Sequence, residues 1–211
     1  MNVKTVHLCD IACNSYILTD EKSGDIAVID PAFFLPELSA LIEPIKQRVK
    51  YILLTHRHFD HVLGAAGIKQ MCPDAKTAVH ALDADGLRSK EASLYNMFKD
   101  AVPHDQTLIE PDILLSDGDE ITLGSVKLRV MHTPGHTAGS IMYISDGVIF
   151  SGDTLFDGSI GRTDLPSGSM HDMRMSLRAI RKMTGDYIVY TGHGGTTTLK
   201  NEQKFNSYMG S

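Results

Sequence analysis

Tryptophan is absent from this 211-residue chain, and cysteine is scarce, with only three residues. An odd set of three thiols does not support a disulfide framework, and a chain of this length does not need one to fold. Cys9 and Cys13 could in principle bind a metal, but two thiols without a second pair are a weak metal motif. We therefore predict that Cys9, Cys13 and Cys72 are free thiols, buried or partly buried.

Long apolar runs and an excess of positive charge are also lacking. No apolar stretch of the sequence approaches 18 residues, so no membrane-spanning helix and no membrane partner are predicted. The formal net charge is −6 and the pI is near 5.9, which argues against a nucleic-acid partner. At the N-terminus, Asp10 and Asn14 interrupt the apolar residues, so a signal peptide is not predicted and the cytoplasm is the expected location.

Length and composition favour one domain that spans residues 1–211. Hydrophobic residues make up 42% of the chain and charged residues 22%, which is typical of a chain that buries its own core. Strands are predicted where short apolar runs lie between turn residues, at Asn14–Leu18, Ile26–Asp30, Tyr51–Thr55, Lys76–His80, Ser125–Met131, Ser140–Ile144, Val148–Ser151 and Tyr187–Thr191.

Two segments have helical character. The first is Val62–Met71, which Pro73 brings to an end. The second begins with a capping residue at Ser169, after which apolar residues recur on one face, at Met173, Leu177 and Ile180. Because mixed strands fall into two groups that each need cover on an outer face, we predict an α/β fold with two sheets packed together and flanked by helices.

Residues that commonly bind metals follow four of the predicted strands. They lie in "THRHFDH" (55–61), "HTPGHT" (132–137), "SGDTLF" (151–156) and "TGHGG" (191–195). Sites form where strand ends converge, because the strands fix the positions and the loops supply the side chains. The recurrence of such residues at four strand ends makes chance a poor explanation and predicts a metal centre.

The number of candidate ligands predicts two cations. One zinc ion takes about four ligands, so seven protein ligands suit two ions that share a bridging carboxylate, about 3.5 to 4 Å apart. Zn²⁺ is the expected metal, and iron or manganese would also accept this donor set. We assign His56, His58 and His136 to the first ion, Asp60, His61 and His193 to the second, and Asp153 to both.

The motifs "THRHFDH", "HTPGHTAGS", "SGDTLFDGSIGRTDLPSG" and "TGHGGTTTLKNE" resemble those of the metallo-β-lactamase fold superfamily. Among its members, the chain is most similar to small hydrolases of the glyoxalase II (hydroxyacylglutathione hydrolase) type. The resemblance implies a four-layer αββα sandwich and cleavage of a small thioester by a hydroxide that bridges the two metals. It also implies that Asp60 both binds metal and orients this nucleophile, and is therefore catalytic.

The resemblance leaves the substrate open. Full-length glyoxalase II has a C-terminal helical domain that contributes to glutathione binding, and this chain is expected to lack it. Arg162 lies where relatives place a basic residue, so it either binds a substrate carboxylate or pairs with Asp164. The segment Asp83–Glu110 is expected to form either a lid over the site or a surface helix.

Other reactions are known on the same scaffold. Persulfide dioxygenases resemble this chain too, and their single iron would be held here by His56, His136 and Asp153. A lactonase, a phosphodiesterase, a β-lactamase and a non-catalytic binding protein are less favoured, the last because no ligand is lost. The sequence does not predict the oligomeric state.

Overall fold

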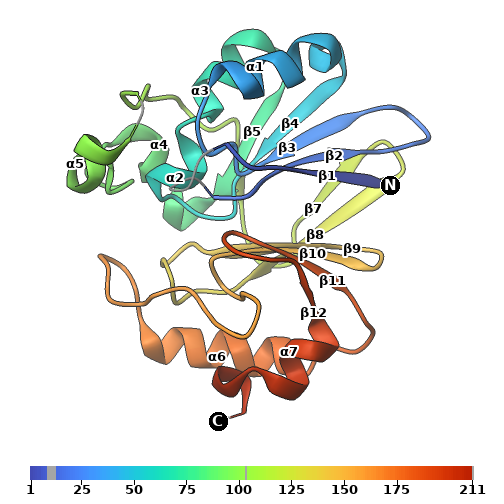
Figure 1. Ribbon diagram of the computed structural model, residues 1–211, viewed down its shortest axis with the longest axis vertical. Coiled ribbons are helices and arrows are strands. Elements are labelled where there is room, and N and C mark those ends of the chain that lie inside the picture. Colours follow the sequence, from blue (N-terminus) through green and yellow to red (C-terminus); the bar gives the residue numbers. More distant parts are fainter. Residues whose placement is uncertain (9–12, 103, 211) are drawn as a thin grey trace.

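The computed structural model describes residues 1–8, 13–102 and 104–210, so Cys9 lies outside the described residues. Two six-stranded sheets pack together, and each is built from one half of the chain (Figure 1). The first sheet contains, in spatial order, β1 (Asn2–Val6), β2 (Ser15–Thr19), β3 (Ile26–Ile29), β4 (Val49–Leu53), β5 (Lys76–His80) and β6 (Ile113–Leu115). The second contains β12 (Thr197–Thr198), β11 (Ile188–Thr191), β10 (Val148–Gly152), β9 (Ile141–Ser145), β8 (Val126–His132) and β7 (Glu120–Leu123).

Both sheets mix parallel and antiparallel pairing. In the first sheet β1, β2 and β3 are antiparallel, and β3 to β6 are parallel. In the second sheet β10 and β11 are parallel and the other neighbours are antiparallel. The parallel strands β4, β10 and β11 all lead into segments with predicted metal ligands.

Helices cover the outer faces, so the fold has four layers (Figure 1). The half of the chain that forms the first sheet carries α1 (Pro36–Ile42), α2 (Phe59–Val62), α3 (Ala65–Met71), α4 (Asp85–Arg88) and α5 (Tyr95–Phe98). The other half carries α6 (Met170–Arg181) and α7 (Leu199–Phe205). This arrangement confirms the predicted αββα sandwich. Among the described residues, no helix has the length and apolar character needed to cross a bilayer.

The core consists of three main apolar layers. Successive strand residues point to opposite faces of a sheet, so Val28 contributes to the cluster with helices α1 and α3, whereas Ile29 packs between the sheets. In β9, Tyr143 likewise packs between the sheets and Met142 packs with Leu177 of α6. Both faces of β3 and β9 are therefore buried, which explains the nearly continuous apolar sequence of these strands.

The eight predicted strands match the structure to within two residues at each end, whereas β1, β6, β7, β12, α1 and α7 were not predicted. The strand Lys76–His80 has the predicted bounds, and Ser169 caps α6 by accepting a hydrogen bond from the Asp172 amide at 3.2 Å. The helical character predicted for Val62–Met71 is confirmed for Ala65–Met71, but the structure has two short helices here, and α2 and α3 are separated at Leu63 and Gly64. At the break the Gly64 amide donates to the Pro31 carbonyl at 2.7 Å, and a Cβ at this position would lie 2.4 Å from that oxygen.

Asp20 joins the two sheets at the end opposite to the metal motifs. Its carboxylate accepts hydrogen bonds from the Ser125 amide at 2.8 Å, the Ser125 hydroxyl at 2.9 Å and the Ser23 amide at 3.1 Å. These bonds, that of the Ser125 amide first, hold the pKa of Asp20 well below its usual value of 3.8. A depressed folded-state pKa contributes stability above the unfolded pKa that is lost as the pH falls.

We expect Asp20→Asn to lower the free energy of unfolding at pH 7, because the amide can replace only one of the two acceptor oxygens. The difference from the parent protein should shrink below about pH 4, where Asp20 in the unfolded chain becomes protonated. Urea denaturation across this pH range measures it. Asp146→Asn, at an exposed turn, is the matched control and should change stability little at either pH; a difference that persists at pH 3 would contradict the prediction.

Candidate metal centre

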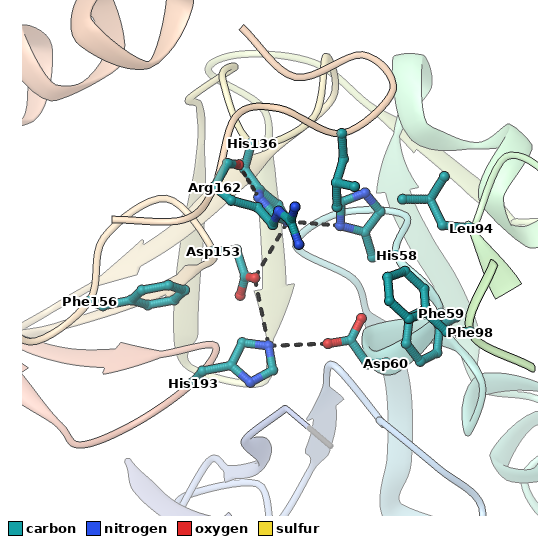
Figure 2. Close-up of a pocket in the computed structure, with 11 residues that line it drawn as sticks. His58, Phe59, Asp60, Leu94, Phe98, His136, Asp153, Phe156, Arg162 and His193 are labelled. Atoms are coloured by element: carbon teal, nitrogen blue, oxygen red, sulfur yellow. Dashed lines mark hydrogen bonds and ion pairs between the residues drawn. The ribbon is translucent and has the colours of Figure 1, made fainter. Parts of the chain in front are cut away.

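The seven predicted ligands lie together at one edge of the two sheets. The segment after β4, which includes α2, provides four of them, and the segments after β8, β10 and β11 provide one each. Figure 2 shows five of these side chains around a common cavity. The full set is His56, His58, Asp60, His61, His136, Asp153 and His193.

Three groups of donor atoms are compact enough to hold a cation. Within each group the donor atoms lie within 4.8 Å of one another: His56, His58 and His136; His56, His61 and Asp153; and Asp60, His61 and His193. The first and third groups have the same membership as the two sets assigned from the sequence. The geometry is thus compatible with two cations, and metal binding itself remains a prediction.

Asp153 lies between these two sets of ligands. Its Oδ1 is 3.3 Å from His61 Nε2, and its Oδ2 is 3.4 Å from His136 Nε2 and 3.6 Å from His193 Nε2. Its carboxylate therefore faces nitrogens of both sets, as expected for a bridging ligand. On the other side, Asp60 Oδ2 lies 3.1 Å from His193 Nε2 (Figure 2).

The buried donor atoms are poorly satisfied by the protein alone. Among the described side chains, His56 Nε2, His61 Nε2 and Asp153 Oδ1 are buried without a hydrogen-bond partner. His58 Nδ1 and His136 Nε2 face each other at 2.8 Å. Unpaired polar atoms in a protein interior cost free energy, and a cation at the centre would satisfy several at once. The donor set of imidazoles and carboxylates fits zinc, iron or manganese.

For His56, His58 and Asp153 the environment favours the protonation states that metal binding requires. Burial lowers the pKa of His56 well below its usual value and lowers that of His58 to about 3. Burial opposes ionisation of Asp153, but His61 and His136 outweigh it and lower the pKa of this carboxyl. At neutral pH the two imidazoles are therefore neutral and the carboxylate is ionised, so their lone pairs are available. Burial opposes the charged form of His61 and His193 as well, but nearby acidic groups outweigh it and raise the pKa of both, so a cation bound there would displace a proton.

Asp30 orients two of the histidines through the ring nitrogens that face away from the centre, His61 directly and His56 through Thr55. Its Oδ2 lies 3.0 Å from His61 Nδ1 and accepts a hydrogen bond from the Thr55 hydroxyl at 2.6 Å. Thr55 Oγ1 in turn lies 3.2 Å from His56 Nδ1. With Nδ1–H as the donor, both rings direct Nε2 toward the centre. In the sequence, Asp30 is only the last residue of a predicted strand, and no local motif marks it as part of the site.

His136 is oriented by the backbone. Its Nδ1 lies 2.7 Å from the Arg162 carbonyl oxygen, so Nε2 points toward His58 and Asp153. The segment with Arg162 therefore contributes to the centre through its main chain, a role that the sequence did not reveal.

Glycines allow the strand ends to approach one another. Gly152 has a φ of +49°, and a Cβ there would lie 2.3 Å from the Thr55 hydroxyl. A Cβ at Gly192 would lie 2.1 Å from Asp153 Oδ1. Any other residue at these two positions would therefore displace Thr55 or Asp153.

A cavity of about 310 Å³ opens above the donor atoms. Its floor is polar and its walls are apolar (Figure 2). The walls consist of Phe59, Leu94, Phe98, Phe156 and Leu165, and Arg162 is the cation among the lining residues.

Arg162, Arg57 and Phe59 lie near the cavity and differ in their contacts. Arg162 pairs with Asp164 through Nε at 2.7 Å and Nη2 at 2.8 Å, and it also lines the cavity. Arg57, which lies between two ligands in the sequence, points away from the centre, and its Nη1 donates to Asp85 Oδ1 at 3.1 Å. The Phe59 side chain, also between two ligands, lines the cavity wall.

The segment Asp83–Glu110 is not the single surface helix considered above. It begins at the last residue of the 3₁₀ turn Ala81–Asp83 and contains the short helices α4 and α5 and the 3₁₀ turn Lys99–Ala101. Leu94 and Phe98 of this segment reach the cavity, so the segment forms one of its walls.

A four-layer sandwich with a His and Asp cluster at the edge of its sheets is typical of metal-dependent hydrolases. Comparison with protein families gives the same answer, because the model of the metallo-β-lactamase superfamily matches residues 10–193. The chain belongs to this superfamily.

Individual relatives match all or nearly all of the chain. It is 30% identical to the hydroxyacylglutathione hydrolase GloC of Haemophilus influenzae, over 100% of this chain and 99% of that protein. The crystal structure of the B3 metallo-β-lactamase BLEG-1 superposes with a TM-score of 0.87 at 29% identity and covers all of both chains. That of TTHA1623 in a di-iron-bound form gives a TM-score of 0.79 at 30% identity, over 97% of this chain and 99% of that one.

We expect Asp30→Asn to weaken zinc binding by about 10- to 100-fold, as is typical when a group that orients metal ligands is changed. Asparagine tolerates the φ of +46° at this position, so the backbone need not move. Calorimetric titration of metal-free protein with Zn²⁺ measures the effect. Asp25→Asn, at the other end of β3, is the control and should bind zinc like the parent; equal affinity of both variants would exclude an orienting role for Asp30.

Proposed function

We propose that the protein is a dinuclear metallohydrolase that cleaves small thioesters. The observation that supports this proposal most is the position of Asp153, whose two oxygens face the nitrogens of both predicted ligand sets. The similarity to GloC favours a thioester as the substrate. The di-iron form of TTHA1623 favours two cations, with zinc or iron as the metal.

Two bound divalent cations would lower the pKa of water toward about 7 and polarise the carbonyl of the substrate. In the reaction, the C–S bond of the thioester breaks and a C–O bond to the water oxygen forms. The products are a carboxylate, a thiol and one proton. A thiol has a reference pKa near 8.5 and can leave as thiolate, so no general acid is required.

Side chains of this protein would bind and orient the reactants. Burial disfavours the ionised form of Asp60, but His61 and a hydrogen bond from His193 outweigh it and lower the pKa of this carboxyl. Asp60 is therefore an acceptor at neutral pH that can orient the attacking water as well as bind metal. Arg162, at the cavity, can hold a carboxylate of the thiol carrier if it exchanges its partner Asp164.

We expect zinc-loaded protein to release thiol from S-lactoylglutathione, and we expect metal analysis of protein purified without added metal to give about two ions per chain. Removal of metal by a chelator should abolish the release, and added Zn²⁺ should restore it. The competing hypothesis is a dioxygenase with one iron on His56, His136 and Asp153. One iron per chain and oxygen uptake with glutathione persulfide, without thiol release from the thioester, would establish that reaction instead.

We expect Asp153→Ala to lower kcat/KM for the thioester by more than about 100-fold, since changes to outer partners of metal ligands alone cost about 10- to 100-fold. The bound metal should fall below two ions per chain, which elemental analysis measures. Asp157→Asn, in the exposed loop after β10, is the control and should retain both metal and activity. Full turnover by Asp153→Ala would refute the bridging role.

A further inference from the structure

The cavity above the metal centre has apolar side chains on two sides. Phe59, Leu94 and Phe98 stand on one side of the polar floor, and Phe156 stands on the other (Figure 2). Leu165 completes this set of five apolar lining residues, which we call the apolar wall. Its members come from segments far apart in the sequence, so the wall exists only in the folded chain.

One side of the apolar wall is fixed by specific contacts. The rings of Phe59 and Phe98 stack with centroids 5.1 Å apart and an interplanar angle of 23°. The Phe59 amide donates to the Ser93 carbonyl at 2.9 Å, which ties the segment with Leu94 to the helix that carries Asp60. This side of the cavity is therefore held in a fixed position relative to the predicted ligands.

Leu94 is placed in the cavity by an uncommon backbone conformation. Its φ of +64° and ψ of +11° lie in the left-handed region, which leucine rarely adopts because its Cβ crowds the backbone. Leu94 is 6% exposed. The preceding Ser93 is anchored by its hydroxyl, which donates to Gln106 Oε1 at 2.6 Å. A strained leucine that persists at a cavity is consistent with a role in binding.

Charge is scarce on the cavity lining above the floor. Among the described lining residues, Arg162 is the cation, and both of its bonded nitrogens already face Asp164. The volume of about 310 Å³ lies at the lower limit for small-molecule sites, about 300 to 1,000 Å³. A polar carrier with several charged groups, such as glutathione, finds little to bind inside, whereas a short apolar group matches both the size and the chemistry.

We propose that the apolar wall binds the acyl group of the thioester and selects an unbranched apolar acyl chain of about four to six carbons over a small or hydroxylated one. The thiol carrier then lies toward Arg162 and the solvent. This inference rests on the proposed thioester hydrolysis and uses the same balanced reaction, in which water replaces the thiol on the acyl carbon. Phe98 and Leu94 determine the specificity and do not touch the reacting bond.

The test uses zinc-loaded protein and a series with one carrier: S-acetyl-, S-butyryl- and S-hexanoylglutathione, with thiol release as the readout. Burial of each methylene should raise kcat/KM by about three- to fourfold, and we expect hexanoyl to exceed acetyl by at least about tenfold. Phe98→Ala should lower kcat/KM for the hexanoyl substrate by about tenfold and for the acetyl substrate by less than about twofold.

Met97→Ala is the matched control, because Met97 lies on the same short helix but is 60% exposed and lines no part of the cavity. It should leave the whole series unchanged. Melting temperature and zinc content of each variant show that the fold and centre are intact. Equal rates for acetyl and hexanoyl, or an unchanged profile for Phe98→Ala, would overturn the inference, while thiol release itself would still support the hydrolase.

A binding measurement tests the apolar wall without depending on hydrolysis. S-Hexylglutathione and S-methylglutathione are thioethers that cannot be hydrolysed, and calorimetry compares their affinities for the zinc-loaded protein. We expect the hexyl compound to bind at least about tenfold more tightly, and Phe98→Ala to remove most of this difference. Tighter hexyl binding without thiol release from any thioester would support the apolar wall and refute the hydrolase; equal binding of both thioethers would refute the apolar wall.

Discussion

The hydrogen bonds accepted by Asp30 are the interaction on which the geometry of the centre depends. One carboxylate oxygen receives both the His61 ring and the Thr55 hydroxyl, and through Thr55 it also positions His56. The other oxygen accepts the Thr55 amide at 2.7 Å, which fixes the start of the loop that carries the ligands. A carboxylate bonded in this way favours one orientation of each histidine, with the second ring nitrogen directed toward the centre.

The sandwich brings the two halves of this centre together through bonds between the sheets. The Ile141 amide donates to the Thr55 carbonyl at 2.9 Å, and the Tyr143 hydroxyl donates to the Leu54 carbonyl at 2.9 Å. The buried Asp83 carboxylate adds bonds to the Arg57 amide and the Thr137 hydroxyl. These contacts join the loop with "THRHFDH" to the strand and loop around His136, so both ligand sets are positioned against one another by ordinary protein hydrogen bonds.

Structural features that depend on neighbouring residues could mostly be predicted from the sequence. The strand Lys76–His80 and the capped start at Ser169 were predicted because alternation and capping involve neighbouring residues. The break before α3 was not, because it depends on the approach of Gly64 to Pro31, more than thirty residues earlier. The orienting role of Asp30 was missed for the same reason, since its partners lie 25 and 31 residues away. The position of Leu94 in the cavity was missed for a different reason, because it depends on a backbone conformation that leucine rarely adopts.

The ligands of each predicted set come from both halves of the chain, so a bound ion would make the stability of the fold depend on the metal supply. An ion held by His58 from the first half and His136 from the second acts as a cross-link between the two sheets. Because the unfolded chain does not preform such a site, binding adds to folding stability in proportion to the logarithm of free metal over its dissociation constant. Under metal starvation the sheets would separate more readily, and the chain would become easier for proteases to degrade.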